Sequence, residues 1–163
     1  MRYPGQLAAH GKPDRGLDWF TRPVECLPGT PWAGLRLPLP SARVFGGVAG
    51  QLAAVRRYVR SELAGHPALD AAELTASELA ANAITHTASG QPGGTFEVQL
   101  ARLGGAHAVV LVADQGARTR PTVQHAAPDA ESGRGLDLVT SLAAAFTVLG
   151  DPGGRAILAI LPA

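Results

Sequence analysis

The chain has 163 residues, of which 46% are hydrophobic and 5% aromatic, which fits one domain with a core of alanine, leucine and valine. A formal net charge of +1 gives no electrostatic reason to expect a nucleic acid or an anionic membrane as partner. The sole cysteine, Cys26, excludes an intramolecular disulfide or a cysteine-based metal cluster, and the lack of a signal-peptide core or an apolar run of roughly 18 residues predicts a cytoplasmic protein.

Residues 1–40 form a proline- and glycine-rich arm ahead of the domain expected at residues 41–163. Prolines at this density oppose regular helix and central strand, so we expect a partly disordered arm with one short strand near residues 35–39. The aromatic side chains of Trp19, Phe20 and Trp32 indicate that the arm docks on a surface. Its own domain is the simpler interpretation, and a partner or a second copy in a homodimer is the alternative.

Two helices are expected next. In residues 48–65 apolar side chains recur with a helical period, which predicts one buried stripe: Val48, Leu52, Val55, Val59 and Leu63. The arginines at positions 56, 57 and 60 lie off this stripe, on a solvated face or a docking patch.

Residues 70–89 form the second expected helix. We expect Asp70 to cap its start, with Glu73 in capping-box position. The expected apolar stripe is Leu74, Leu79, Ala83 and Ile84. Glu78, Asn82 and His86 follow at i, i+4 and i+8, so they line one edge of the helix.

The remainder of the chain alternates strands with loops and one helix. Strands are expected at residues 95–103 and 106–113, joined by a Gly104-Gly105 turn. A long loop at 114–132, of the kind that serves as a lid or binding loop, precedes a helix at 135–145 and strands at 146–149 and 155–161. This order predicts an α+β sandwich with helices on one face of a mostly antiparallel mixed sheet.

Two residues of the second helix have the chemistry of a phosphate-transfer site. The amide oxygen of Asn82 suits Mg²⁺, a hard ion that takes few protein ligands and completes its shell with phosphate and water. Glu78 is ionised at neutral pH and can accept a hydroxyl proton. The simpler alternatives are an asparagine bonded to nearby backbone and an exposed helical glutamate.

Two further segments could bind a nucleotide. Asp114 ends an apolar strand, where its carboxylate could accept a hydrogen bond from an exocyclic amine, and Gly116 lets the backbone pass close to a base. Gly133, Arg134 and Gly135 precede a helix, and glycine N–H groups, a helix N-terminus and a guanidinium all favour phosphate. The alternatives are a common Asp-x-Gly turn and a flexible glycine hinge.

Three motifs in this order resemble those of the GHKL ATPases, the histidine-kinase-like superfamily: ELAANAITH at 78–86, VVLVADQG at 109–116 and ESGRGLDLV at 131–139. The chain is most similar to stand-alone anti-sigma-factor serine/threonine kinases of actinobacteria, from about Arg43 to the C-terminus. The resemblance implies a helix layer over a mixed sheet. It also implies that Asn82 binds the Mg²⁺–triphosphate, Glu78 acts in transfer, Asp114 reads adenine, and the glycine box binds phosphates.

The resemblance implies an ATP- and Mg²⁺-dependent kinase that phosphorylates an anti-anti-sigma antagonist and binds a sigma factor. The alternative is a nucleotide-binding interaction module with little transfer, and a detached histidine-kinase domain is a less favoured third. Three positions depart from the family pattern: Arg118 replaces a glycine, Glu131 a basic residue, and Ala156 a threonine that helps to hold adenine. The departures at Arg118 and Ala156 bear on nucleotide affinity, and the departure at Glu131 bears on catalytic rate.

Overall fold

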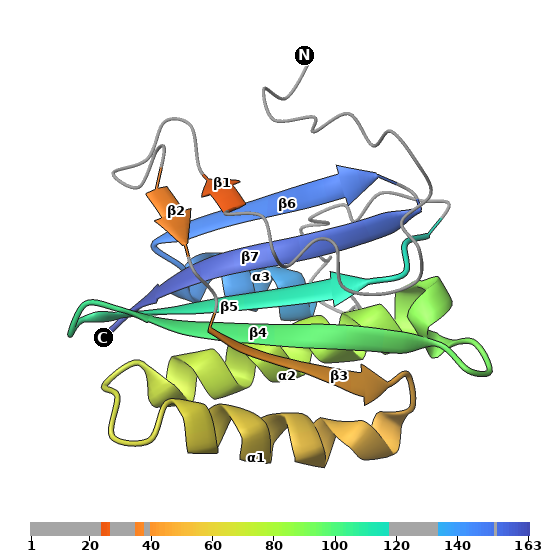
Figure 1. Ribbon diagram of the computed structural model, residues 1–163, viewed down its shortest axis with the longest axis horizontal. Helices are drawn as coiled ribbons and strands as arrows, with labels where there is room; N and C mark the ends of the chain where they lie inside the picture. The colour runs from red at the N-terminus through yellow and green to blue at the C-terminus, as the bar shows by residue number, and fades with distance from the viewer. Residues whose placement is uncertain (1–23, 27–34, 38–39, 118–133, 152) are drawn as a thin grey trace.

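A computed structural model describes residues 24–26, 35–37, 40–117, 134–151 and 153–163 (Figure 1). The described elements are, in chain order, β1 (Val24–Cys26), β2 (Leu35–Leu37), β3 (Ser41–Gly46), the short 3-10 helix η1 (Ala49–Gln51), α1 (Leu52–Glu62), α2 (Leu69–His86), the short 3-10 helix η2 (Ala88–Gly90), β4 (Thr95–Leu103), β5 (His107–Asp114), α3 (Arg134–Leu142), β6 (Ala145–Asp151) and β7 (Gly154–Pro162).

The main sheet has five strands in the order β3-β4-β5-β7-β6, and each of its four pairings is antiparallel. Side chains alternate between the two faces of a strand, so each central strand contributes to two apolar layers. On β4, for example, Phe96, Val98 and Leu100 belong to the layer beneath the helices, whereas Ala101 belongs to the layer on the opposite face.

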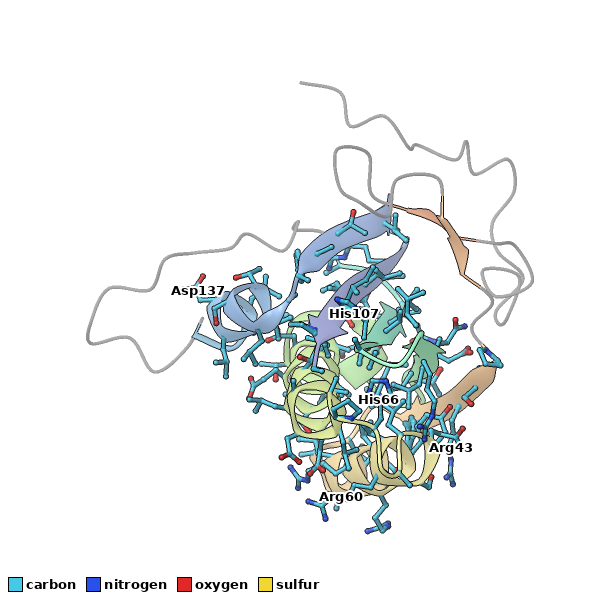
Figure 2. All side chains as sticks on the ribbon, turned by 90° about the vertical axis from the view of Figure 1, so that its left-hand side faces the viewer. Arg43, Arg60, His66, His107 and Asp137 are labelled. Atoms are coloured by element: carbon cyan, nitrogen blue, oxygen red, sulfur yellow. The ribbon has the colours of Figure 1, made fainter. Side chains whose placement is uncertain are left out.

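The three α-helices cover one face of the sheet (Figures 1 and 2). Helix α2 packs against β5 and lies between α1 and α3. It buries mainly small side chains, Ala72, Thr75, Ala76, Leu79, Ala80 and Ala83, and small residues let a helix backbone approach its neighbours closely. The predicted α+β sandwich with helices on one face is therefore confirmed.

The opposite face of the sheet carries a second buried apolar cluster, made mainly by β5 and β7: Ala101, Val109, Leu111, Ala145, Ala156, Leu158 and Ile160. The antiparallel pair β1–β2 lies on this side of the sheet, away from the helices. The strand expected near residues 35–39 is thus present as β2. Of the predicted arm, the remaining residues up to position 39, apart from β1, lie outside the described part.

Polar contacts join α1 to its neighbours. Arg60, on the outer surface of α1 in Figure 2, donates from Nε and Nη2 to the two carboxylate oxygens of Glu73, at 2.5 and 2.8 Å. Arg102 of β4 donates to the carbonyl oxygens of Glu62 and Ala64 at 3.0 and 2.9 Å. These bonds satisfy carbonyl groups that the end of a helix leaves without an intrahelical partner.

Several local predictions were wrong. Helix α2 begins at Leu69 with Ala68 at its N-cap and without a side-chain cap, so Asp70 and Glu73 form no capping box. Two residues expected in apolar stripes are exposed, Leu74 at 39% and Val48 at 60%. Strand β3 was not expected from the sequence. Only one of its side chains, Phe45, is buried, so the strand shows no alternation of apolar and polar residues that would predict it.

No helix in the described ranges is long and apolar enough to cross a membrane.

Candidate functional site

One edge of α2 carries the polar residues that the sequence singled out. Glu78 and Asn82 are half-buried, one turn apart, and His86 at the end of the helix is exposed. On a helix, Cβ atoms four residues apart are about 5–6 Å from each other. The predicted acid and amide therefore lie side by side on the surface of the central helix, where both could reach one ligand.

Glu78 lies against the start of α3. A Cβ atom placed on Gly135 would be 2.3 Å from Glu78 Oε2 and 3.3 Å from its Cδ. The absence of a side chain at Gly135 therefore makes room for the carboxylate. The structure thus brings together two predicted site residues from separate motifs, and the contact requires glycine at position 135.

The turn after β5 holds the second part of the candidate site. Asp114 Oδ1 accepts a hydrogen bond from the backbone N–H of Gly116 at 2.6 Å. Gly116 has a φ of +79°, in the left-handed region that glycine adopts without strain. Burial raises the pKa of Asp114, and the Gly116 N–H and the Arg155 charge partly offset this rise.

This turn is fastened to the segment that follows α2. The buried Ser89 hydroxyl accepts from the N–H of Gln115 at 3.0 Å. The N–H of Ala88 donates to the carbonyl of Gly116 at 2.8 Å. These two bonds fix the Asp-x-Gly turn relative to the end of α2. The segment around Ser89 was expected only as the end of the helix, and no sequence signal marked it as a support.

The neighbour of Asp114 across the sheet is Arg155. The two residues are register partners on β5 and β7, Arg155 Nε lies 3.9 Å from Asp114 Oδ1, and both side chains are only 7% exposed. Ala156 instead belongs to the cluster on the opposite face. The sequence interpretation took Ala156 as the residue relevant to the base, but strand alternation places Arg155 on the side of Asp114.

A shallow, open pocket of about 440 Å³ lies between the end of α2 and the turn after β5. Its lining is Thr85, His86, Thr87, Ala88, Gln91, Gln115, Gly116 and Ala117. The pocket therefore adjoins Asp114 without including it. His86, which the sequence placed on the same edge as Glu78 and Asn82, contributes to this lining.

The rest of the predicted glycine box is only partly described. Arg134 is the first residue of α3, while Gly133, Glu131 and Arg118 lie outside the described residues. Within the described part there is no group of three or more His, Cys, Asp or Glu residues that could hold a metal. The half-buried amide of Asn82 fits Mg²⁺, which needs few protein oxygens when phosphate supplies the others.

Residues 47–161 match the family model of the histidine kinase-like ATPase domain. This range is more than half of the chain, so the chain belongs to that family. The motifs around Asn82, Asp114 and Gly135 all lie within the matched range, which confirms the family resemblance found in the sequence.

Two comparisons concern individual proteins. The chain is 40% identical over 98 residues to an anthranilate phosphoribosyltransferase from Anaeromyxobacter dehalogenans strain 2CP-C, a match that covers 58% of this chain and 28% of that protein. It is also similar to the crystal structure of the RsbU and RsbW domains of Rv1364c from Mycobacterium tuberculosis, with a TM-score of 0.52 and 18% identity over 76% of this chain and 33% of that one. The chain thus spans a third or less of either protein, and the structural likeness shows the fold alone.

Proposed function

We propose that the chain binds ATP with Mg²⁺ on the helix-covered face of the sheet and transfers the terminal phosphate to a serine or threonine of a partner protein. The observation that carries this proposal is the contact between Glu78 and Gly135. It places a carboxylate beside the N-terminus of α3, where backbone N–H groups and the helix dipole favour a phosphate.

The proposed binding roles follow from the position of each residue. Asp114 would accept a hydrogen bond from the exocyclic amine of adenine through Oδ2, since the Gly116 N–H already occupies Oδ1. Asn82 would offer its amide oxygen to Mg²⁺, which when bound offsets the negative charge of the triphosphate. Gly133, Arg134 and Gly135 would hold the phosphates at the start of α3.

Glu78 is the proposed general base. In the transfer step the acceptor hydroxyl oxygen bonds to the γ-phosphorus, the bond from that phosphorus to the β–γ bridging oxygen breaks, and ADP leaves. Glu78 takes the hydroxyl proton. A positioned base contributes typically about 10²–10⁴-fold to such a step, and the remainder comes from positioning and charge neutralisation.

The proposed acceptor is an anti-anti-sigma antagonist, and the second partner is a sigma factor. The similarity of the three motifs to those of anti-sigma-factor kinases supports this choice. The fold shared with the RsbU and RsbW domain structure is compatible with it. In this role the protein would act in the cytoplasm as a regulator of transcription without contacting nucleic acid itself.

The test combines transfer and binding on the same variant. Purified chain is incubated with γ-labelled ATP, Mg²⁺ and candidate antagonist proteins, beside Glu78→Gln. We expect the wild type to label one serine or threonine, and Glu78→Gln to lose at least about 100-fold in rate while its ATP affinity stays within about twofold. Equal transfer by both proteins would overturn the role of Glu78.

A nucleotide-binding module without transfer is the other outcome of this experiment. It would appear as saturable ATP binding by wild type and Glu78→Gln alike, without label on any antagonist, and with an affinity for the partner that differs between ATP and ADP. That result would retain the nucleotide site and remove the kinase.

A further inference from the structure

Two exposed leucines lie beside the contact between Glu78 and Gly135. Leu74 of α2 is 39% exposed and Leu138 of α3 is 38% exposed. Of the exposed large apolar side chains in the described part of the chain, only these two belong to α-helices. Leu74 precedes Glu78 by four residues and Leu138 follows Gly135 by three, so each leucine is the surface neighbour of one residue of the contact.

Helices α2 and α3 run in opposite directions. Helix α2 ends near the turn after β5, because the N–H of Ala88 donates to the carbonyl of Gly116 at 2.8 Å. Helix α3 leads into β6, which begins at the other end of the sheet, where α2 also begins (Figure 1). One turn back along α2 and one turn forward along α3 therefore lead the same way, and both leucines lie on the side of the contact away from Asp114.

The order of residues along α2 matches the geometry of the proposed transfer. Asp114, the proposed adenine acceptor, lies near the end of α2, and Asn82, Glu78 and Leu74 follow at intervals of one turn toward the start of the helix. In phosphoryl transfer the attacking and leaving oxygens are roughly in line with the phosphorus. The acceptor hydroxyl therefore approaches from the side opposite ADP, which is the side of the leucines.

We propose that Leu74 and Leu138 select the acceptor segment of the partner protein by binding an apolar side chain next to its phosphorylated serine or threonine. The inference rests on the proposed kinase function and specifies the class of substrate segment. Leucine offers neither charge nor hydrogen bonds, so this surface gains affinity by removing apolar area of the partner from water. A segment with only polar residues around the acceptor would lack this contribution.

The distance between Leu74 and Glu78 sets the spacing of the two residues in the partner. A helix rises about 1.5 Å per residue, so the leucine lies about 6 Å along α2 from the proposed base. An extended segment covers this distance in about two residues, at roughly 3.3 Å each. The apolar residue is therefore expected within two positions of the acceptor.

The experiment uses the transfer assay with γ-labelled ATP, Mg²⁺ and purified antagonist proteins, and mass spectrometry locates the labelled residue. Leu74→Ala and Leu138→Ala should each raise KM for the labelled antagonist about 3- to 10-fold, as expected for lost apolar burial. The double variant should raise it about 10- to 100-fold. The value of kcat and the affinity for ATP should stay within about twofold, which is the pattern of lost substrate binding.

Controls separate recognition from folding. Leu74→Met and Leu138→Met keep an apolar side chain of similar volume and should keep KM within about threefold. Val44→Ala shortens a valine of β3 that is 51% exposed and should leave KM unchanged. Its neighbour Phe45 belongs to the layer beneath the helices, so Val44 lies on the opposite face. Thermal unfolding shows whether each variant is folded.

A change in the partner tests the contact itself. Replacing the apolar residue next to the acceptor by serine should raise KM for the wild-type kinase and have a smaller effect with the double alanine variant, as for any pair in direct contact.

The outcomes distinguish the two proposals. Two results would overturn the role of the leucines and keep the kinase: an unchanged KM in the double alanine variant, or a labelled residue without an apolar neighbour within two positions. Absence of label on any antagonist would overturn the kinase and, with it, this inference.

Discussion

Gly135 shows how one residue without a side chain can set the position of a functional group. Because Gly135 has no side chain, the Glu78 carboxylate can lie against it. A Cβ atom on residue 135 would be 2.3 Å from Glu78 Oε2. The group that must yield is the end of a flexible side chain, so the strain can be relieved by moving the carboxylate. The residue is therefore expected to matter for activity more than for stability.

Replacing Gly135 by alanine should displace Glu78 and slow phosphoryl transfer by about 100-fold, since a misplacement of about 1 Å can cost this much. The thermal midpoint should change by no more than a few degrees. Gly50→Ala is the matched control, because a Cβ at Gly50 has no neighbour within 4 Å. Transfer at the wild-type rate by Gly135→Ala would show that the observed position of Glu78 is not required.

Among the elements, the connection from α2 to β4 depends on close backbone contacts. A Cβ at Gly47 would be 1.6 Å from the carbonyl oxygen of Ser89, and one at Gly94 would be 2.2 Å from the same atom. The N–H of Gly47 also donates to the carbonyl of Gly94 at 2.9 Å. These contacts hold Ser89, whose hydroxyl in turn supports the turn after β5.

We expect Gly94→Ala to lower the free energy of unfolding by roughly 2–4 kcal/mol, because the new methyl group meets backbone that cannot yield without moving the loop. Urea unfolding followed by circular dichroism measures this loss. Gly105→Ala, at a site with nothing within 4 Å, should change stability by less than about 1 kcal/mol. Similar values for the two variants would contradict the proposed support of the loop.

Elements were easier to predict from the sequence than their contacts. Periodic segments identified α1, α2 and β4, because burial of one face imposes a period. A nearly continuous apolar run, typical of a strand covered on both faces, identified β5. The capping box is absent because α2 begins at Leu69, so Asp70 lies inside the helix. Glu73 instead pairs with Arg60 of another helix, a tertiary contact that local sequence does not reveal. The order of the motifs indicated Glu78, Asn82 and Asp114 as candidate site residues. That Arg155 lies beside Asp114 could be seen only from the register of β5 with β7.

For the whole molecule, the sheet face opposite the helices contains a buried acid. Glu97 is 5% exposed, and burial raises its pKa, although the hydrogen bond from Gln99 Nε2, 3.1 Å from Glu97 Oε1, partly offsets this. Because the pKa is higher in the folded than in the unfolded state, the folded state binds this proton more tightly. The contribution of protonated Glu97 to stability is therefore present at low pH and is lost as the pH rises through the pKa of Glu97 in the folded state.

Glu97→Gln should remove this dependence. The difference in unfolding free energy between the variant and wild type should favour the variant at pH 7, shrink as the pH falls through the raised pKa of folded Glu97, and level off below about 4, near the pKa of an unfolded glutamate. Urea unfolding of both proteins between these pH values tests this. A difference that stays constant with pH would show that Glu97 has the same pKa in the folded and unfolded states.

The most direct test of a nucleotide site on the helix-covered face is calorimetric titration of the folded chain with ATP and Mg²⁺, beside Asn82→Ala and Asp114→Ala. We predict saturable binding by wild type that weakens at least about tenfold in each variant, on the order of one lost polar contact. Removing Mg²⁺ should weaken ATP binding by the wild type more than it weakens ATP binding by the Asn82→Ala variant. No heat of binding from wild type at millimolar ATP would contradict the proposed site and, with it, the kinase.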